Sequence, residues 1–156
     1  MSSYLNFYLV PKKTKQNHIF EDGQNKIEEI KLSEGKPLLL RSYSRGNEIY
    51  QAYNDTLCIE YGGMEDKYTD LTYDKANRVV EEYKDSVLKT EKRLETDYKM
   101  LKEGGYSSEL WDEIHSFEDY LSEEKNTLSE LEWIADFVSE INGDYCDFEK
   151  IIINID

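Results

Sequence analysis

The amino-acid sequence predicts an α+β fold, in which a small, mostly antiparallel sheet packs against the base of a long, coiled-coil-like antiparallel α-hairpin. Two observations support this prediction. Apolar residues recur every seven positions over residues 72–141, and alternating or β-branched segments lie on both sides of that region. The chain has 156 residues, so we expect a single domain over 1–156. Its parts are a sheet-rich segment (1–71), the hairpin (72–141), and a turn with a final strand (142–156).

The N-terminal part carries the signals of short strands. Residues 3–10 alternate with a period of two, which predicts a strand that ends at Pro11. Residues 28–32 and 38–43 predict two further strands joined by a turn. Within the second of these, the run Leu38-Leu39-Leu40 predicts burial on both faces of the sheet.

Residues 47–54 allow two interpretations, a short helix or the second arm of a β-hairpin. Helical spacing of the apolar residues, behind a capping residue at Ser44 or Asn47, favours the helix. The apolar residues at this spacing are Ile49, Ala52 and Tyr53. Residues 56–61 then predict a strand that ends at the Gly62-Gly63 pair.

Residues 72–141 predict two long helices that contact each other along matched apolar rows, here called the seam. A Gly104-Gly105 break separates them, and Ser107 or Ser108 caps the second helix. A link this short makes the helices antiparallel. The first row is Ala76, Val80, Tyr83, Val87, Leu94 and Leu101, and the second helix contributes Leu110, Ile114, Phe117, Leu121, Leu128, Leu131, Ala135 and Val138.

The apolar face of the hairpin is broad at its base and narrow toward the Gly104-Gly105 tip. A broad face needs a second packing partner, so we expect the base to contact the sheet and the tip to project into solvent. The residues that broaden the base are Tyr73, Val79, Val80, Tyr83, Trp133, Ile134, Phe137, Val138 and Ile141. Asn142-Gly143 ends the second helix, and residues 151–155 predict a strand inside the sheet.

Negative charge is concentrated on the second helix. The chain has a net charge of −15, and residues 107–141 carry 11 anions against one cation, Lys125, a net charge of −10. Residues 72–106 carry eight of each, a net charge of zero. The acids could form an ordinary solvated face, neutralised across the hairpin by first-helix cations, or a contact surface for a basic partner. These cations are Lys84, Lys89, Lys92, Arg93 and Lys99.

The candidate interaction surface lies near the tip of the second helix. It consists of carboxylates on successive turns together with one tryptophan. Its residues are Glu109, Asp112, Glu113, Glu118, Asp119, Glu123 and Trp111. Two further acids, Asp97 and Glu124, interrupt the seam, where polar residues fix helix register, and we expect Lys84 or Lys89 to reach Glu124.

No motif nominates a catalytic residue or a cofactor. Asp112, His115 and Asp119 share one helix face, but bundle metal sites draw ligands from four helices, so we expect no metal. The two cysteines, Cys58 and Cys146, lie in no metal or redox motif, and we expect both to be small buried side chains. An aromatic and basic cluster is expected to be half-buried in the sheet; it consists of Tyr43, Tyr50, Tyr53, Tyr61, Tyr68, Arg41 and Arg45.

Composition excludes several classes of partner. The net negative charge argues against direct binding of nucleic-acid phosphates. The start of the chain does not resemble a signal peptide, and no apolar run approaches the roughly 20 residues of a membrane span. We therefore expect no membrane contact and a cytoplasmic location.

Two segments, residues 3–11 and 43–53, resemble parts of small acidic proteins carried by bacteriophages of gut Bacteroidetes. The resemblance implies a viral or prophage setting, and thus the host cytoplasm. It includes no functional motif, so no catalytic or binding residue carries over.

The sequence favours a non-enzymatic, acidic protein-interaction module that binds a protein with a basic surface through its second helix. In a phage setting it would have an accessory or host-modulating role. Two other functions stay open: a nucleic-acid-mimicking inhibitor of a host DNA-binding protein or nuclease, and an enzyme of unknown type. A homodimer through the hairpin, with Trp111 in the contact, also stays open.

Overall fold

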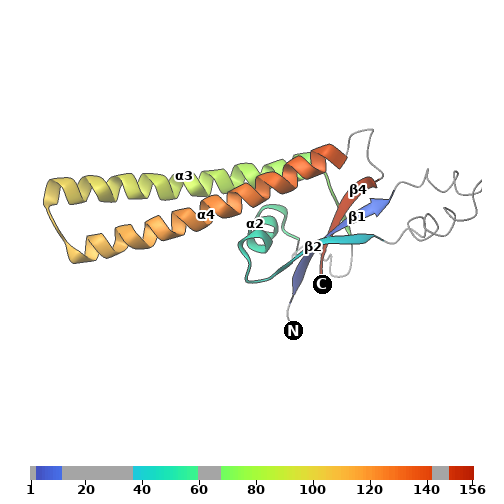
Figure 1. Ribbon diagram of the computed structural model, residues 1–156, viewed down its shortest axis with the longest axis horizontal. Coiled ribbons are helices and arrows are strands. Elements are labelled where there is room, and N and C mark those ends of the chain that lie inside the picture. Colours follow the sequence, from blue (N-terminus) through green and yellow to red (C-terminus); the bar gives the residue numbers. More distant parts are fainter. Residues whose placement is uncertain (1–2, 12–36, 60–67, 142–147) are drawn as a thin grey trace, which may run out of the picture.

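The computed structural model describes residues 3–11, 37–59, 68–141 and 148–156. They form one four-stranded sheet, a short helix and a long helical hairpin, which confirms the predicted α+β fold (Figure 1). The elements in chain order are β1 (Tyr4–Pro11), β2 (Leu38–Ser44), α2 (Glu48–Leu57), β3 (Thr69–Leu71), α3 (Tyr73–Gly104), α4 (Ser108–Ile141) and β4 (Phe148–Ile155).

The sheet is antiparallel, with strand order β2-β1-β4-β3. Phe7 of β1 lies opposite Arg41 of β2 and Ile153 of β4, and Ile153 also lies opposite Thr69 of β3. The last strand is therefore internal, as its β-branched run predicts, and all of residues 151–155 are buried.

The hairpin consists of two helices of 32 and 34 residues, each about 50 Å long. Thr72 caps α3 by accepting a hydrogen bond from the backbone N–H of Lys75, and Ser107 accepts one from the N–H of Leu110 in the first turn of α4. Gly105 has φ of +79°, a conformation that favours glycine, and its N–H donates to the carbonyl of Leu101. These caps explain why the chain reverses at residues 105–107.

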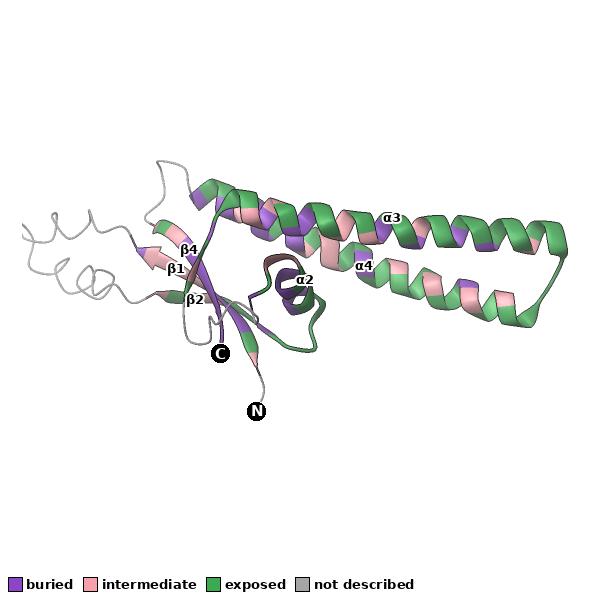
Figure 2. Ribbon diagram, turned by 180° about the vertical axis from the view of Figure 1, so that it is seen from behind, coloured by how far each residue is buried: buried purple, intermediate pink, exposed green. Residues whose placement is uncertain are grey.

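The base of the hairpin (residues 73–87 of α3 and 126–141 of α4) packs on the sheet and on α2, which confirms the predicted docking. One buried cluster joins Leu5, Phe7 and Ile153 of the sheet to Tyr53 of α2 and Leu131 of α4. The Phe7 ring meets the Tyr53 ring edge to face at 5.2 Å between centroids. The rest of the hairpin projects away from the sheet, and Figure 2 shows its surface as mainly exposed.

Two predictions about the N-terminal part are wrong. Leu38 and Leu39 are exposed, at 43% and 59%, because β2 is an edge strand and is not covered on both faces. The strand predicted over 56–61 is wrong for its described residues, 56–59, because α2 continues to Leu57 and stops at Cys58 with φ of +53°. Cys58 is consequently exposed and not a buried small side chain.

The short helix at residues 47–54 is confirmed, and its cap is Asn47, whose Oδ1 accepts a hydrogen bond from the N–H of Ile49 at 2.8 Å. The strand β3 was not predicted, because three residues are too few to show a period. The strand predicted at 28–32, the turn at Asn142-Gly143, and residues Tyr61, Gly62, Gly63 and Cys146 lie outside the described residues.

Candidate functional site

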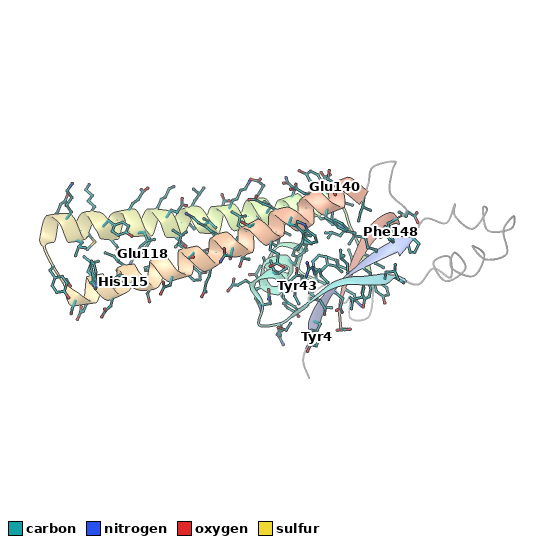
Figure 3. All side chains as sticks on the ribbon, in the orientation of Figure 1. Tyr4, Tyr43, His115, Glu118, Glu140 and Phe148 are labelled. Carbon is teal, nitrogen blue, oxygen red and sulfur yellow. The ribbon has the colours of Figure 1, made fainter. Side chains whose placement is uncertain are left out.

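The part of the hairpin beyond the sheet, residues 88–125, is here called the distal hairpin. It holds all seven residues of the candidate interaction surface, and none of its residues belongs to the buried cluster beneath the sheet. Figure 3 shows His115 and Glu118 toward the free end of the hairpin, far from Tyr43 and Phe148 of the sheet. Most of the candidate surface thus lies on the hairpin away from the sheet, whereas Glu123 lies where α4 passes α2 and lines a hollow with Asn47 and Glu48.

Four carboxylates form what we call the acidic stripe on α4: Glu109, Asp112, Asp119 and Glu123. The last three lie at i, i+7 and i+11, which places them on the outer face, opposite the seam. All four are exposed, and none forms an ion pair with another described residue. Their charges therefore face solvent.

The two remaining acids of the candidate surface have partners on α3. Arg93 Nη2 donates to Glu113 Oε1 at 2.9 Å, and the hydroxyl of Tyr98 donates to Glu118. This hydrogen bond is the main reason why the pKa of Tyr98 is raised. Of the first-helix cations expected to neutralise α4, Arg93 does so, whereas Lys84 pairs with Glu81 on its own helix at 3.4 Å.

Three ring side chains form what we call the aromatic tip: Tyr106, Trp111 and His115. The Trp111 and His115 rings meet edge to face at 4.7 Å between centroids, and the Tyr106 ring lies 6.5 Å from that of Trp111. Tyr106 is 78% exposed and Trp111 is 43% exposed. His115 therefore packs on an indole, and among the described residues no group of three His, Cys, Asp or Glu side chains is placed to hold a metal ion.

Two acids lie inside the seam, as their sequence positions predict. Asp97 and Glu124 are each 1% exposed. Glu124 Oε2 accepts from the Ser86 hydroxyl at 3.0 Å, and neither Lys84 nor Lys89 forms an ion pair with Glu124 among the described residues. The prediction that one of these lysines reaches Glu124 is therefore wrong. No described residue donates to Glu124 Oε1, which leaves a covered carboxylate oxygen without a protein partner.

The covered carboxyl of Asp97 lies beside an ion pair. Its Oδ1 is 3.7 Å from Arg93 Nε, and no described residue donates to its Oδ2. Loss of solvation raises the pKa of Asp97, the nearby charge of Glu113 raises it further, and Arg93 lowers it in part. The carboxyl of Asp97 is therefore protonated at a higher pH in the folded chain than in the unfolded chain.

A groove of about 510 Å³, here called the lateral groove, runs between the two helices of the distal hairpin. Leu94 and Leu121 form its apolar floor, and Glu91, Glu95 and Glu118 lie along its sides. Tyr98, Ser122 and Lys125 complete the lining. Lys125 Nζ lies 3.6 Å from Glu91 Oε1, so the one cation of the lining is already paired. The floor of the groove is thus apolar and its sides are acidic.

The expected aromatic and basic cluster is divided between the core and the surface. Tyr43, Tyr50 and Tyr53 are buried, whereas Tyr68 is 53% exposed and its ring meets that of Tyr8 edge to face. The hydroxyl of Tyr43 donates to Glu130 of α4 at 2.6 Å, and burial together with this contact raises the pKa of Tyr43. Tyr43, Tyr50 and Tyr53 therefore belong to the buried cluster between the sheet and the hairpin, and Tyr68 does not.

Trp133 is one of the residues expected to broaden the apolar face at the base of the hairpin, and it is 43% exposed there. Its indole stacks on Phe137 at 5.4 Å, and the Arg41 guanidinium of β2 lies 5.4 Å from the ring centroid. This link between β2 and α4 has no signal in the sequence, because it joins residues far apart in the chain. These contacts identify Trp133 as a packing residue. Of the two tryptophans, only Trp111 lies at the candidate surface.

No helix in the described part of the chain combines the length and apolar character needed to cross a membrane. Comparison of the chain with known protein families, with curated proteins and with solved structures finds no match.

Proposed function

We propose that this chain is a non-enzymatic, acidic protein-interaction module that binds the basic surface of another protein through the distal part of α4. The observation that carries the proposal is the acidic stripe: four exposed carboxylates without ion-pair partners among the described residues, next to an exposed aromatic tip. Exposed aromatic rings do not improve solubility. At an interface, by contrast, the carboxylates attract a basic partner and the rings supply apolar contact area.

The acids supply steering and selectivity. With a net charge of −10 on residues 107–141, α4 creates a negative field along the rod that accelerates encounters with a cationic surface. It also repels acidic competitors, because like charges brought together at an interface are costly. Since the acids of the stripe are exposed, added salt screens this attraction and weakens binding.

The aromatic tip supplies contact area. Tyr106 and Trp111 hold apolar rings in water, and their burial against a partner contributes favourable free energy without breaking any hydrogen bond that the described structure records. Because His115 already packs on the indole, the ring of Trp111 is held in place before binding. Less conformational entropy is then lost when a partner covers it.

The test compares two triple variants that remove the same charge from the same helix. One, the stripe variant, neutralises three of the four stripe acids (Asp112→Asn, Asp119→Asn, Glu123→Gln). The other, the base variant, neutralises three exposed acids at the base (Glu132→Gln, Asp136→Asn, Glu140→Gln). Tagged wild-type and variant chains are used to capture proteins from a bacterial host lysate. The proposal predicts a partner that the base variant and the wild type retain and the stripe variant loses.

Salt provides the second arm of the test. Raising the salt concentration from about 0.1 M to about 1 M shortens the screening length from about 10 Å to about 3 Å, and should release the partner. Equal capture by both variants, or capture that is insensitive to salt, would contradict the proposal. If the chain displaces DNA from the captured protein, the contact imitates a nucleic-acid backbone; if it does not, the partner uses another basic surface.

A further inference from the structure

We propose that the lateral groove binds an amphipathic helix of the partner, one that carries an apolar row flanked by Lys or Arg. This inference rests on the proposed function and specifies the element of the partner that is recognised. The third helix would complete a three-helix packing over the distal hairpin, and the acidic stripe would remain the surface that attracts the partner.

The first reason is that two helices leave the distal seam incompletely covered. Leu101, Leu110, Phe117 and Leu121 all point along the seam, yet each is only half-buried. At the base, the seam residues Leu131 and Val138 are fully buried, since the sheet and α2 cover the hairpin there. The Arg93 guanidinium lies 5.8 Å from the centroid of the Phe117 ring, but no described strand or further helix covers the distal seam as the sheet and α2 cover the base. Apolar surface left open in this way is stabilised by a further packing partner.

The second reason is the chemistry of the lateral groove. Its floor is formed by Leu94 and Leu121, one from each helix, and accepts apolar side chains. Its sides carry Glu91 and Glu95 on α3 and Glu118 on α4, and the single lining cation, Lys125, is paired with Glu91. A helix with leucine-like residues on one face and cations on both flanks satisfies floor and sides together.

The same charges disfavour a second copy of this chain as the occupant. A second hairpin in the groove would bring another α4, with its net charge of −10, alongside three carboxylates. The described remainder of the chain is not the occupant either. α2 faces the hairpin elsewhere, across a cleft lined by Glu48, Tyr83 and Tyr120, and not across the lateral groove.

The length of the groove defines the partner further. Its lining covers residues 91–98 of α3 and 118–125 of α4, which is about 10 Å along each helix axis. The essential contact is therefore about two turns of the partner helix, with apolar residues at i, i+3 or i+4, and i+7. Tyr98, at one end of the groove, is 46% exposed and can cover the end of this apolar row.

The test uses two synthetic peptides of about 20 residues with the same leucine and lysine composition. In one, the leucines repeat with heptad spacing, so that they form one helix face; in the other, they are scrambled around the helix. Binding of each peptide to the full chain is measured by fluorescence anisotropy at low salt. We expect the amphipathic peptide to bind at least about tenfold more tightly, because only its leucines reach the groove floor together.

Variants then locate the contact. The groove variant Glu91→Gln, Glu95→Gln, Glu118→Gln should weaken binding of the amphipathic peptide about tenfold, whereas the base variant described above should change it less than twofold. A photoreactive benzoylphenylalanine replaces Ser122, which lines the groove, or Ser116, which is exposed but outside the lining. Cross-linking of the amphipathic peptide is expected from position 122 and not from position 116.

Equal affinities for the two peptides, cross-linking from position 116 alone, or no binding of either peptide would each overturn the groove inference. None of these results bears on the proposed function, which fails only if the stripe variant keeps the captured partner or salt leaves the capture unchanged. The two proposals therefore fail on different measurements.

Discussion

The two halves of the hairpin share one seam but bury different residues in it. At the base, every buried residue of α3 and α4 is apolar; these are Ala76, Val79, Val80, Val87, Leu131, Ile134, Ala135, Val138 and Ile141. In the distal hairpin the buried residues are Thr90, Leu94, Asp97, Ile114 and Glu124, three of which are polar. The helices continue without a break, so the change reflects what each half contacts.

This difference separates the part of the hairpin that stabilises the fold from the part that is free to bind. All of these base residues except Val87 belong to the buried cluster that the hairpin forms with the sheet and α2. Their burial contributes most of the hydrophobic free energy that stabilises the hairpin. Distal residues are covered by one helix, and two of them, Asp97 and Glu124, are carboxyls without full pairing. The distal hairpin thus contains buried groups that lower the stability of the fold, and its outer surface is charged and aromatic.

The largest expected effect comes from a cavity at the base. Leu131→Ala removes a side chain that is 0% exposed, and should lower the free energy of unfolding by about 2–5 kcal/mol. Leu110→Ala, the matched change in the half-buried distal seam, should cost about 1 kcal/mol, because less area is lost from contact. Urea unfolding followed by circular dichroism measures both. Equal losses would contradict the division between base and distal halves.

An apolar residue in place of Glu124 should make the distal seam resemble the base. Glu124→Leu removes a covered oxygen that has no described donor, and should raise the free energy of unfolding by about 1–3 kcal/mol. Ser86, which donates to Glu124, is only half-buried and can turn to water instead. The exposed Glu132→Leu serves as the control, with no comparable gain in urea unfolding. A loss of stability in Glu124→Leu would show that the buried acid is needed.

A smaller effect is expected from Asp97, and it depends on pH. The pKa of Asp97 is raised on folding. Its contribution to the free energy of unfolding is therefore fully present below the pKa of the unfolded chain, about 4, and is lost as pH rises through the pKa of the folded chain. Asp97→Asn, which stays neutral, should therefore melt about 2 °C above the wild type at pH 7, with the difference shrinking toward pH 4. Thermal unfolding at both pH values checks this. A difference of the same size at both would exclude titration of Asp97 as its cause.

The smallest effect on stability is expected at the aromatic tip. Trp111→Ala removes an exposed ring, and should change the free energy of unfolding by less than about 0.5 kcal/mol. Capture of the partner should nevertheless fall, because an aromatic anchor is lost from the contact surface. The two readouts together distinguish a binding residue from a packing residue. Unchanged capture would remove Trp111 from the interaction surface.

The sequence predicts those elements whose residues repeat with a clear period. The seven-residue spacing of Val80, Val87 and Leu94 predicts the hairpin, and the β-branched run at 151–155 predicts an internal strand. A capping residue at Ser44 or Asn47 and the helical spacing behind it favour the helix α2 over a hairpin arm, but they do not predict its last turn. There Thr56 and Leu57 continue the helix until Cys58 adopts a left-handed conformation, so tertiary context overrides strand propensity.

Features that depend on contacts between distant residues could not be predicted. Tyr43 and Glu130 lie 87 positions apart, and nothing local pairs them before the sheet meets the hairpin. The exposure of Leu38 and Leu39 follows from the edge position of β2, which strand composition does not determine. For the candidate surface, helical spacing predicts which acids share a face. The pairing of Glu113 with Arg93, and the lateral groove itself, require the relative position of the two helices.

The most direct test of this account is a residue-resolved NMR titration of the full chain with the amphipathic basic peptide. The account places binding on the distal hairpin and folding stability at the base. It predicts amide shift changes over residues 91–98 and 111–125, with the sheet and the base left unchanged. Shift changes centred on the sheet or α2, or spread evenly over all exposed acids of the chain, would contradict it.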